Sequence, residues 1–316
     1  MNRTKKIISV ALSVVLFGAA LLLLCCCLPY ANVNVDGVYA QVYFNSNTAI
    51  VYGFDKDENV GRYDAQVCYV PETIYYDGEI YTVTELCNVN YDAEFVADGG
   101  HAKRIVIPAT VTSIDLFSFR TSDSFDYLEE IEVHKDNPNY TTINGVLYNK
   151  YCDTLIMYPP AKQDTTMFIN KNVAEIYSNQ LNYSNKHVEK VSVEDGNLIF
   201  SEIDGVLYSN RGALEYVPYA YGSALELPDG VTCIAKWALR YANIEHLYVP
   251  ASVIDIEYSR EVAYNPLRYV SNVYFEAEEP LYAEIFSDYL MNVHCGISRE
   301  GFSELIGADA ESSVLG

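Results

Sequence analysis

Residues 131–148 read IEVHKDNPNYTTINGVLY, and 60 positions later residues 191–208 read VSVEDGNLIFSEIDGVLY. Both stretches open with alternating hydrophobic residues, pass through a polar turn and end on Gly-Val-Leu-Tyr. A second pair of matching stretches follows, LIMYPPA at 155–161 and LEYVPYA at 214–220. Because self-similarity at a fixed period is the signature of repeat architectures, we interpret these stretches as two copies of one structural unit.

A shorter repeated unit surrounds these copies. It reads hydrophobic-x-hydrophobic-Pro, followed by Val and then by Ile three positions later, as in Ile105–Ile114 (IVIPATVTSI). Further copies are Leu225–Ile234, Leu247–Ile256, Met167–Ile176, which has lost the proline, and the truncated Val70–Ile74. Alternating hydrophobic residues predict a short strand with one buried face, and proline ends the strand because it has no N–H to donate.

These units predict an elongated stack. One unit cannot bury its own hydrophobic face, whereas stacked units share a continuous core with parallel strands along one side. Three hairpins are also predicted, because Asn or Asp followed by Gly between hydrophobic runs favours a two-residue turn with positive φ. The three turns are Asp77-Gly78, Asn144-Gly145 and Asp204-Gly205. Their glycines are interpreted as structural, and two turns of the stack are expected to carry a β-meander insertion.

Four stretches carry a resemblance to a known family. Ile105–Ile114, Val133–Tyr148 (VHKDNPNYTTINGVLY), Val70–Leu86 (VPETIYYDGEIYTVTEL) and Val273–Phe286 (VYFEAEEPLYAEIF) resemble the BspA-like leucine-rich repeat surface proteins. The resemblance implies a β-rich leucine-rich-repeat solenoid, right-handed, with short parallel strands and with β-hairpin or meander insertions. It also implies export, surface attachment and adhesion or protein binding, and it offers no catalytic residue to carry over.

Some stretches depart from the family pattern. Val89–His101 and Ser118–Tyr127 are irregular, and Leu116–Phe119 and Lys236–Leu239 stand where the family usually has Gly-x-x-Ala-Phe. The number of turns in the stack is therefore left open.

The first residues have the features of a targeting segment. Met1–Lys6 is short and basic, and Ile7–Leu28 carries no charge. This run is longer than the ~7–15 residues of a secretory hydrophobic region and reaches the ~20 residues of a spanning helix. Residues 1–31 are therefore predicted to be either a cleaved signal peptide or an N-terminal membrane anchor, with everything after them exported. Cys25–Cys27 leaves a lipoprotein as a third possibility, although Leu24 stands where a small residue is usual.

The remaining chain is divided into two parts. Residues 32–296 are assigned to the solenoid. Residues 297–316 are small and polar and are expected to form a disordered tail. A short helix is expected over Tyr282–Met291.

The charge balance excludes some partners. Asp and Glu number 43 against 20 Lys and Arg, which gives a net charge of −23. A surface this acidic repels phosphate backbones and anionic lipids, so nucleic acid is excluded and membrane contact is expected only through the N-terminal segment. The 29 tyrosines suit half-buried positions and contact surfaces.

Side chains that carry chemistry form no recognisable motif. Beyond the N-terminal segment the cysteines are at positions 68, 87, 152, 233 and 295, an odd number without a CxxC pair, so free and buried thiols are predicted. Cys233 occupies the place of Ser113 in the short unit. The five histidines are expected at the surface, at positions 101, 134, 187, 246 and 294. Asp55–Gly61 only approximates a calcium loop and is interpreted as a polar turn.

The favoured function is that of a cell-surface or secreted protein that binds an extracellular protein or glycan, as in adhesion. The chain is predicted not to be an enzyme, with no catalytic, cofactor-binding or metal-binding residue and no cofactor, and its ligand-binding residues stay unassigned. One alternative is a structural scaffold of the cell envelope without a ligand. The other is a carbohydrate-active β-helix enzyme, which would need three or more Asp or Glu, or Asp with Arg, in one groove.

Overall fold

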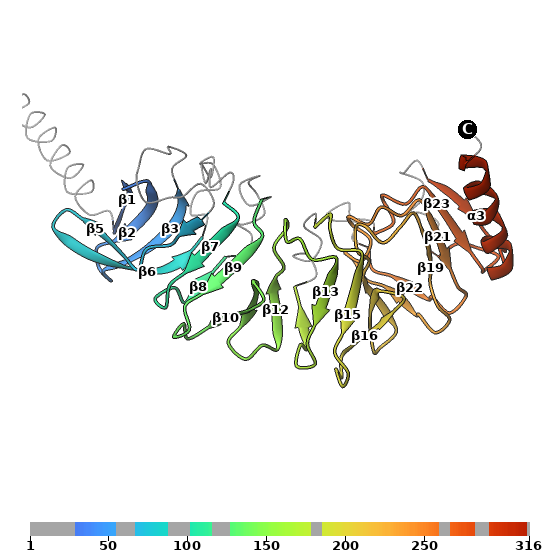
Figure 1. Ribbon diagram of the computed structural model, residues 1–316, viewed down its shortest axis with the longest axis horizontal. Coiled ribbons are helices and arrows are strands. Elements are labelled where there is room, and N and C mark those ends of the chain that lie inside the picture. Colours follow the sequence, from blue (N-terminus) through green and yellow to red (C-terminus); the bar gives the residue numbers. More distant parts are fainter. Residues whose placement is uncertain are drawn as a thin grey trace, which may run out of the picture.

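The computed structural model describes residues 29–54, 67–87, 102–115, 127–177, 185–258, 266–281 and 291–314. Within these ranges the chain forms an elongated, curved array of short strands, with helix α3 (Arg299–Val314) at its C-terminal end (Figure 1). The fold is thus almost entirely β, as the sequence predicted.

One row of parallel strands is formed by the leading hydrophobic-x-hydrophobic segments of the repeats. It comprises three sheets, which are β4 (Val67–Tyr69), β7 (Arg104–Ile107) and β9 (Glu130–Val133); β13 (Thr166–Ile169) and β15 (Lys190–Val193); and β19 (Ala224–Glu226), β21 (His246–Val249), β23 (Asn272–Phe275) and β24 (Asn292–His294). All neighbours in these sheets are parallel. Equivalent residues stand side by side, as Ile105 does beside Ile131, and both are buried.

A second row contains the later part of each unit. It comprises β6 (Glu79–Leu86) with β8 (Ser113–Ile114), β12 (Thr154–Met157) with β14 (Glu175–Ile176), and β18 (Ala213–Tyr216) with β20 (Cys233–Ile234) and β22 (Asp255–Ile256), all parallel. Ser113 and Cys233 begin β8 and β20, as predicted. Stacked parallel strands therefore occur in both rows, whereas the right-handed sense of winding stays a prediction.

Antiparallel hairpins occur where the sequence predicted them. They are β5 (Thr73–Tyr76) with β6, β10 (Tyr140–Ile143) with β11 (Val146–Asn149), and β16 (Phe200–Ile203) with β17 (Val206–Ser209). Asp204 and Gly205 have φ of 51° and 79°, as a two-residue turn of this kind requires. A further turn at Asp36-Gly37 joins β1 (Tyr30–Val35) to β2 (Val38–Tyr43), followed by β3 (Thr48–Phe54), and was not predicted.

Each meander insertion divides the first row. The segment β10–β12 separates β9 from β13, and the segment β16–β18 separates β15 from β19. The turn of each hairpin contacts the strand that precedes it, because Ile131 N donates to Gly145 O at 2.9 Å and Val191 N donates to Gly205 O at 2.7 Å. The insertion thus covers the outer edge of the preceding strand.

A buried asparagine joins successive turns of the stack. The Asn137 side chain is fully buried, and its Nδ2 donates to the carbonyl oxygens of Pro108 and Val111 at 2.9 and 2.8 Å. Its Oδ1 accepts from the amides of Asn139 and Tyr140 at 3.0 and 2.9 Å. All the hydrogen-bonding capacity of this buried amide is therefore satisfied.

Two further asparagines repeat this bridge. Asn197 donates to the carbonyl oxygens of Asn170 and Val173, and Asn185 donates to those of Pro159 and Lys162, all at 3.0 Å. Asn137 and Asn197 hold equivalent places in the two long repeats, which shows that the 60-residue period is also a period of side-chain contacts.

The prediction of a disordered tail from residue 297 was wrong, because Arg299–Val314 forms helix α3. The sequence of this segment is small and polar, but Phe302 is buried and its ring centroid lies 5.4 Å from that of Tyr248 and 5.2 Å from that of Tyr274. The Ser298 Oγ accepts from the Gly301 amide at 3.1 Å and caps the helix. The outer face of the sheet supplies a hydrophobic partner that the tail sequence alone does not reveal.

Several sequence predictions lie outside the described residues. These are the segment Ile7–Leu28, the turn Asp55–Gly61, the irregular stretch Val89–His101, most of the irregular stretch Ser118–Tyr127, and most of the helix expected over Tyr282–Met291. In the residues that the structure describes, no helix is long and hydrophobic enough to cross a membrane.

Candidate functional site

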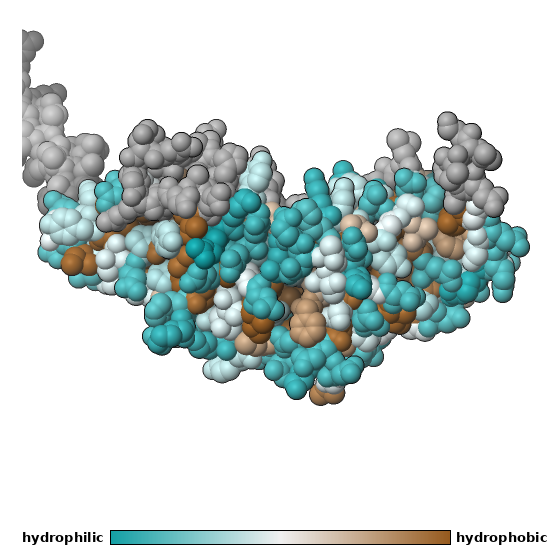
Figure 2. Space-filling view, viewed as in Figure 1, coloured by the Kyte–Doolittle hydropathy of each residue, from teal (hydrophilic) through white to brown (hydrophobic). Residues whose placement is uncertain are grey.

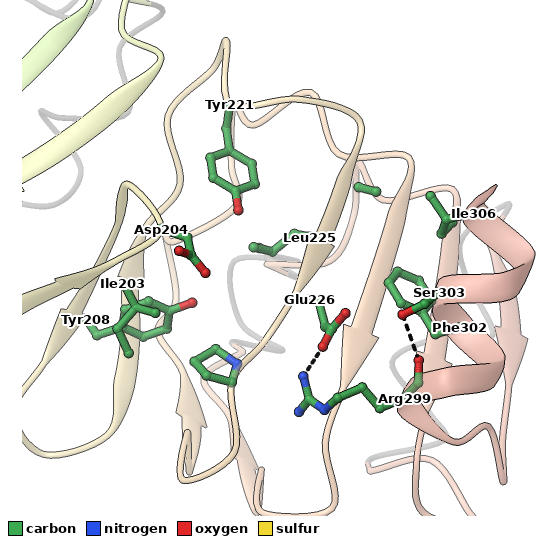
Figure 3. A pocket seen from close by; sticks show the side chains of 12 residues that line it. Ile203, Asp204, Tyr208, Tyr221, Leu225, Glu226, Arg299, Phe302, Ser303 and Ile306 are labelled. Carbon is green, nitrogen blue, oxygen red and sulfur yellow. Dashed lines mark hydrogen bonds and ion pairs between the residues drawn. The ribbon is translucent and has the colours of Figure 1, made fainter. Parts of the chain in front are cut away.

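A groove of about 490 Å³ lies between the β16–β17 turn, strand β19 and helix α3 (Figure 3). Ile203, Asp204 and Tyr208 come from the hairpin, and Tyr221 comes from the segment before β19. Arg299, Phe302 and Ser303 come from the first turns of the helix. The volume falls within the ~300–1,000 Å³ that is usual for ligand sites.

Two tyrosines present hydroxyl groups to the groove. Tyr208 is almost fully buried and Tyr221 is half-buried, and burial raises the pKa of both phenols. The carboxylates of Asp204 and Glu226 add to the raised pKa of Tyr221. Both hydroxyls therefore stay protonated at neutral pH and can donate hydrogen bonds. Figure 3 shows Tyr221 pointing towards Asp204 across the open space.

The hairpin places Asp204 in the groove. Its φ of 51° lies in the left-handed region, which Asp tolerates better than most residues and which Gly205 continues. The Asp204 side chain is exposed, and Ile203 beside it is 43% exposed. The wall therefore combines a carboxylate with an exposed hydrophobic side chain.

The helix wall is fixed by Arg299. Its Nη1 forms a short ion pair with Glu226 Oε1, and its Nη2 contacts Asp229 Oδ1 at 2.8 Å and the Leu227 carbonyl oxygen at 3.2 Å. The guanidinium also lies 5.0 Å from the ring centroid of Tyr248. Because charged hydrogen bonds of this kind are directional, α3 is held at a defined position beside β19.

The floor of the groove is an open strand edge. Ser223 O accepts from His246 N at 3.0 Å, and Leu227 N donates to Tyr248 O at 3.2 Å, so alternate peptide groups of β19 point towards β21. In a parallel ladder the peptide groups between them point the other way, which directs the N–H and C=O of Ala224 and Glu226 away from β21. In the described part of the chain, no strand pairs with that side of β19.

The groove also brings acidic groups close to an arginine. Asp204 and Glu226 line it together with Arg299, which is the combination that a carbohydrate-active enzyme would need. However, Arg299 already engages Glu226 and Asp229. Asp204 is therefore the carboxylate best placed to meet a ligand.

The predicted free thiols are confirmed, but they do not contribute to this groove. Cys68 is buried, whereas the thiols at 87, 152, 233 and 295 are half-buried rather than fully buried as predicted, and all five are free. Burial raises the pKa of Cys87 and of Cys233 to about 11. In the described residues no cluster of three or more His, Cys, Asp or Glu is arranged to hold a metal ion.

The histidines lie elsewhere as well. His134, His187 and His294 are exposed, as expected, and His101 is outside the described residues. His246 differs from the expectation because it is half-buried, with its Nδ1 3.1 Å from the Tyr274 hydroxyl.

Sequence reasoning did not identify the groove. Tyr208 and Asp204 were recognised only as parts of the repeat, and Tyr221, Glu226 and Arg299 were not singled out. The enrichment in tyrosine was the one available signal. The groove joins segments that are about 100 residues apart in the chain, so no local motif could mark it.

A second hollow, of about 470 Å³, lies at the other end of the array. It is lined by Val35 and Asp36 of the first hairpin and by Tyr69, Pro71 and Tyr75 near β4 and β5. Tyr69 and Tyr75 are 49% and 65% exposed. The face drawn in Figure 2 is largely hydrophilic, with hydrophobic side chains standing between polar ones. We assign the candidate site to the groove beside β19, because its walls combine rings, an exposed carboxylate and an open strand edge with a helix that Arg299 holds in place.

Comparison with known proteins gives structural neighbours only. No protein-family model matches the chain, and no curated protein does. The chain is similar to the pneumococcal vaccine antigen PcpA, with 14% identity, a TM-score of 0.39 and coverage of 86% of this chain and 89% of that chain. It is similar to a leucine-rich repeat protein from Eubacterium ventriosum, with 13% identity, a TM-score of 0.40 and coverage of 84% and 85%. A leucine-rich cell surface protein from Faecalibacterium prausnitzii gives 15% identity, a TM-score of 0.32 and coverage of 86% and 97%.

Proposed function

We propose that the chain is an exported cell-surface repeat protein, and that its leucine-rich-repeat solenoid binds a protein or glycan ligand in the groove beside β19. One observation carries this proposal. Two tyrosine hydroxyls, an exposed carboxylate and an open strand edge converge on a single groove. Convergent polar groups on a partly hydrophobic hollow are typical of a recognition site.

The surrounding structure supports rigid presentation of this site. The ion pairs of Arg299 hold α3 beside β19, and Val191 N holds the β16–β17 turn against β15. Both walls are thus attached to strands of the array. Little conformational entropy of the protein would therefore be lost when a ligand binds, so affinity would not be reduced by this cost. The hydrophobic segment Ile7–Leu28 supports the proposed export.

The groove favours binding over catalysis. Paired carboxylates act in glycoside hydrolysis when both can approach the scissile bond. Here the Glu226 carboxylate is engaged by Arg299. The proposal therefore assigns no catalytic role to any residue.

Binding of the full chain, purified in mild detergent, to a panel of extracellular-matrix proteins and glycans at physiological salt tests this function. We expect saturable binding to at least one class of ligand. Tyr221→Ala should weaken it about tenfold, as is usual when an interfacial tyrosine is truncated. Tyr151→Ala is the matched control, because Tyr151 is 81% exposed and does not line the groove.

Three results would contradict the proposal. Absence of saturable binding by the folded protein across the panel would favour an envelope scaffold. Binding that is equally affected by both tyrosine variants would place the site elsewhere. Release of shortened oligosaccharides from a panel glycan would favour the carbohydrate-active enzyme.

A further inference from the structure

We infer that the ligand of this groove is an extended polypeptide segment, which pairs as an added strand with the open edge of β19 and places a basic side chain at Asp204. The inference rests on the proposed binding function and names its partner class. It follows from a difference between the two strands on either side of the β16–β18 insertion: the insertion covers the edge of β15 and leaves the edge of β19 open.

The insertion covers one strand edge and leaves the other open. On one side, Val191 N of β15 donates to Gly205 O of the hairpin turn, so the turn satisfies the edge of the preceding strand. On the other side, the peptide groups of Ala224 and Glu226 point into the groove, and no described strand pairs with them. Open edges of this kind are sites where a second chain adds by main-chain hydrogen bonds.

The spacing of these groups suits a peptide. Residues two apart on a strand are separated by roughly 6.6 Å, and each presents one donor and one acceptor. A polypeptide strand repeats the complementary donor and acceptor at the same interval, whereas an oligosaccharide has no such repeat. Side chains of the added strand would alternate between opposite faces of the groove.

The charges of the groove favour a basic ligand. Arg299 engages Glu226 and Asp229, which leaves the exposed Asp204 facing the open space. The rings of Tyr208 and Tyr221 line the same space and can also attract a cation. The net charge of −23 draws basic ligands towards the protein and repels acidic ones.

The other meander insertion provides an internal comparison. Strand β13 likewise has no described partner on the side of the β10–β11 hairpin. At that turn Asn144, with φ of 51°, stands where Asp204 stands in the second hairpin. Asn is therefore compatible with the backbone conformation of Asp204, which makes Asp204→Asn a substitution that removes the charge and keeps the turn.

Synthetic heptapeptides test the inference directly. The probe is a capped Lys-Thr-Lys-Val-Lys-Thr-Lys peptide, titrated by isothermal calorimetry into the full chain in mild detergent, beside its counterpart with Glu in place of every Lys. We expect saturable binding of the Lys peptide only. N-methylation of alternate amides removes the ladder hydrogen bonds on one edge of the peptide. Two methylated versions of the Lys peptide are compared, one methylated at the odd-numbered amides and the other at the even-numbered amides. The version whose methylated edge faces β19 should bind at least about tenfold more weakly, while the other should keep its affinity.

Two further measurements locate the site. Asp204→Asn should weaken binding of the Lys peptide about two- to fivefold, as expected for loss of one surface ion pair. Asp77→Asn is the matched control, because Asp77 occupies the same position of a remote hairpin turn with φ of 49°. Hydrogen exchange of the amides of Ala224 and Glu226 should slow when the peptide is bound.

The possible failures are distinguishable. If no peptide binds while a matrix protein or glycan binds and Tyr221→Ala weakens it, the proposed function stands and strand addition is overturned. Peptide binding that is unchanged in both methylated versions, or equally weakened in both, also overturns strand addition. If neither the peptides nor the panel bind, both proposals are overturned.

Discussion

The main-chain amide of Val191 donates a hydrogen bond to the carbonyl oxygen of Gly205 at 2.7 Å. The corresponding pair in the first long repeat, Ile131 and Gly145, makes the same contact at 2.9 Å. The turn approaches the strand so closely that a Cβ on Gly205 would lie 2.6 Å from the Cβ of Lys190. Glycine is therefore needed at this turn both for its positive φ and for the approach of the hairpin to β15.

Gly205→Ala should destabilise the protein by about 2–5 kcal/mol. The new methyl group would be placed in the left-handed region and against Lys190, so the costs of backbone strain and of overpacking add. Gly78→Ala is the matched control, because its φ is 87° but nothing lies within 4 Å of the added Cβ. It should cost only about 1–2 kcal/mol. The midpoints of urea unfolding give the comparison, and equal midpoints for the two variants would contradict the close-approach explanation.

The turns show what sequence can predict here. Asp204-Gly205 and Asn144-Gly145 set their local conformation with two adjacent residues, so the hairpins were predicted and confirmed. The first row of parallel strands followed from the repeats in the same way, whereas the second row was not predicted, because strands were expected along one side only. Helix α3 was missed because Phe302 is stabilised by Tyr248 and Tyr274, which precede it by 54 and 28 positions. The groove was missed because its walls come from three separate segments, and pairing between distant segments has no local signature.

Asn137→Asp should destabilise the fold at neutral pH. The Nδ2 of Asn137 donates to the Pro108 and Val111 carbonyls, and a carboxylate oxygen in its place would repel both. With two buried carbonyl oxygens left unpaired, the cost should be at least about 2–4 kcal/mol.

The pH dependence of the Asn137→Asp variant tests whether the charge of the buried carboxylate causes the destabilisation. Burial against carbonyl oxygens should raise the pKa of the introduced carboxyl above its value in the unfolded chain. The folded state then binds its proton more tightly, so the defect should be smallest below the pKa of the unfolded chain and should grow as pH rises through the folded value. Urea midpoints measured between pH 3 and pH 7, relative to the parent chain, test this. A difference that shrinks with rising pH would contradict it.

Phe302→Ala should release the start of helix α3 from the sheet. The Phe302 side chain is buried against Tyr248 and Tyr274, and truncation of a buried phenylalanine costs about 3–5 kcal/mol. This small terminal cluster has few other contacts to offset the loss. Hydrogen exchange over residues 299–307 should therefore accelerate strongly. Leu305→Ala is the control, because Leu305 is 45% exposed, and comparable acceleration in that variant would indicate general fraying of the helix.

The thiols of Cys87 and Cys233 should react slowly while the protein is folded. Burial, followed by neighbouring carboxylates, raises the pKa of each from an ordinary value of 9.0 to about 11. At pH 8 the fraction of each thiol that is deprotonated should therefore be about 100-fold lower than in the unfolded chain. Only this deprotonated fraction reacts with an alkylating reagent. The higher basicity makes the remaining thiolate more nucleophilic, which restores about tenfold. Alkylation by iodoacetamide, followed by peptide mass spectrometry, should thus be about tenfold slower at both sites than in urea. A rise in pH to about 10 should remove the difference, because the folded thiols are then only about tenfold less often deprotonated. Equal folded and unfolded rates at pH 8 would show that burial does not protect these thiols.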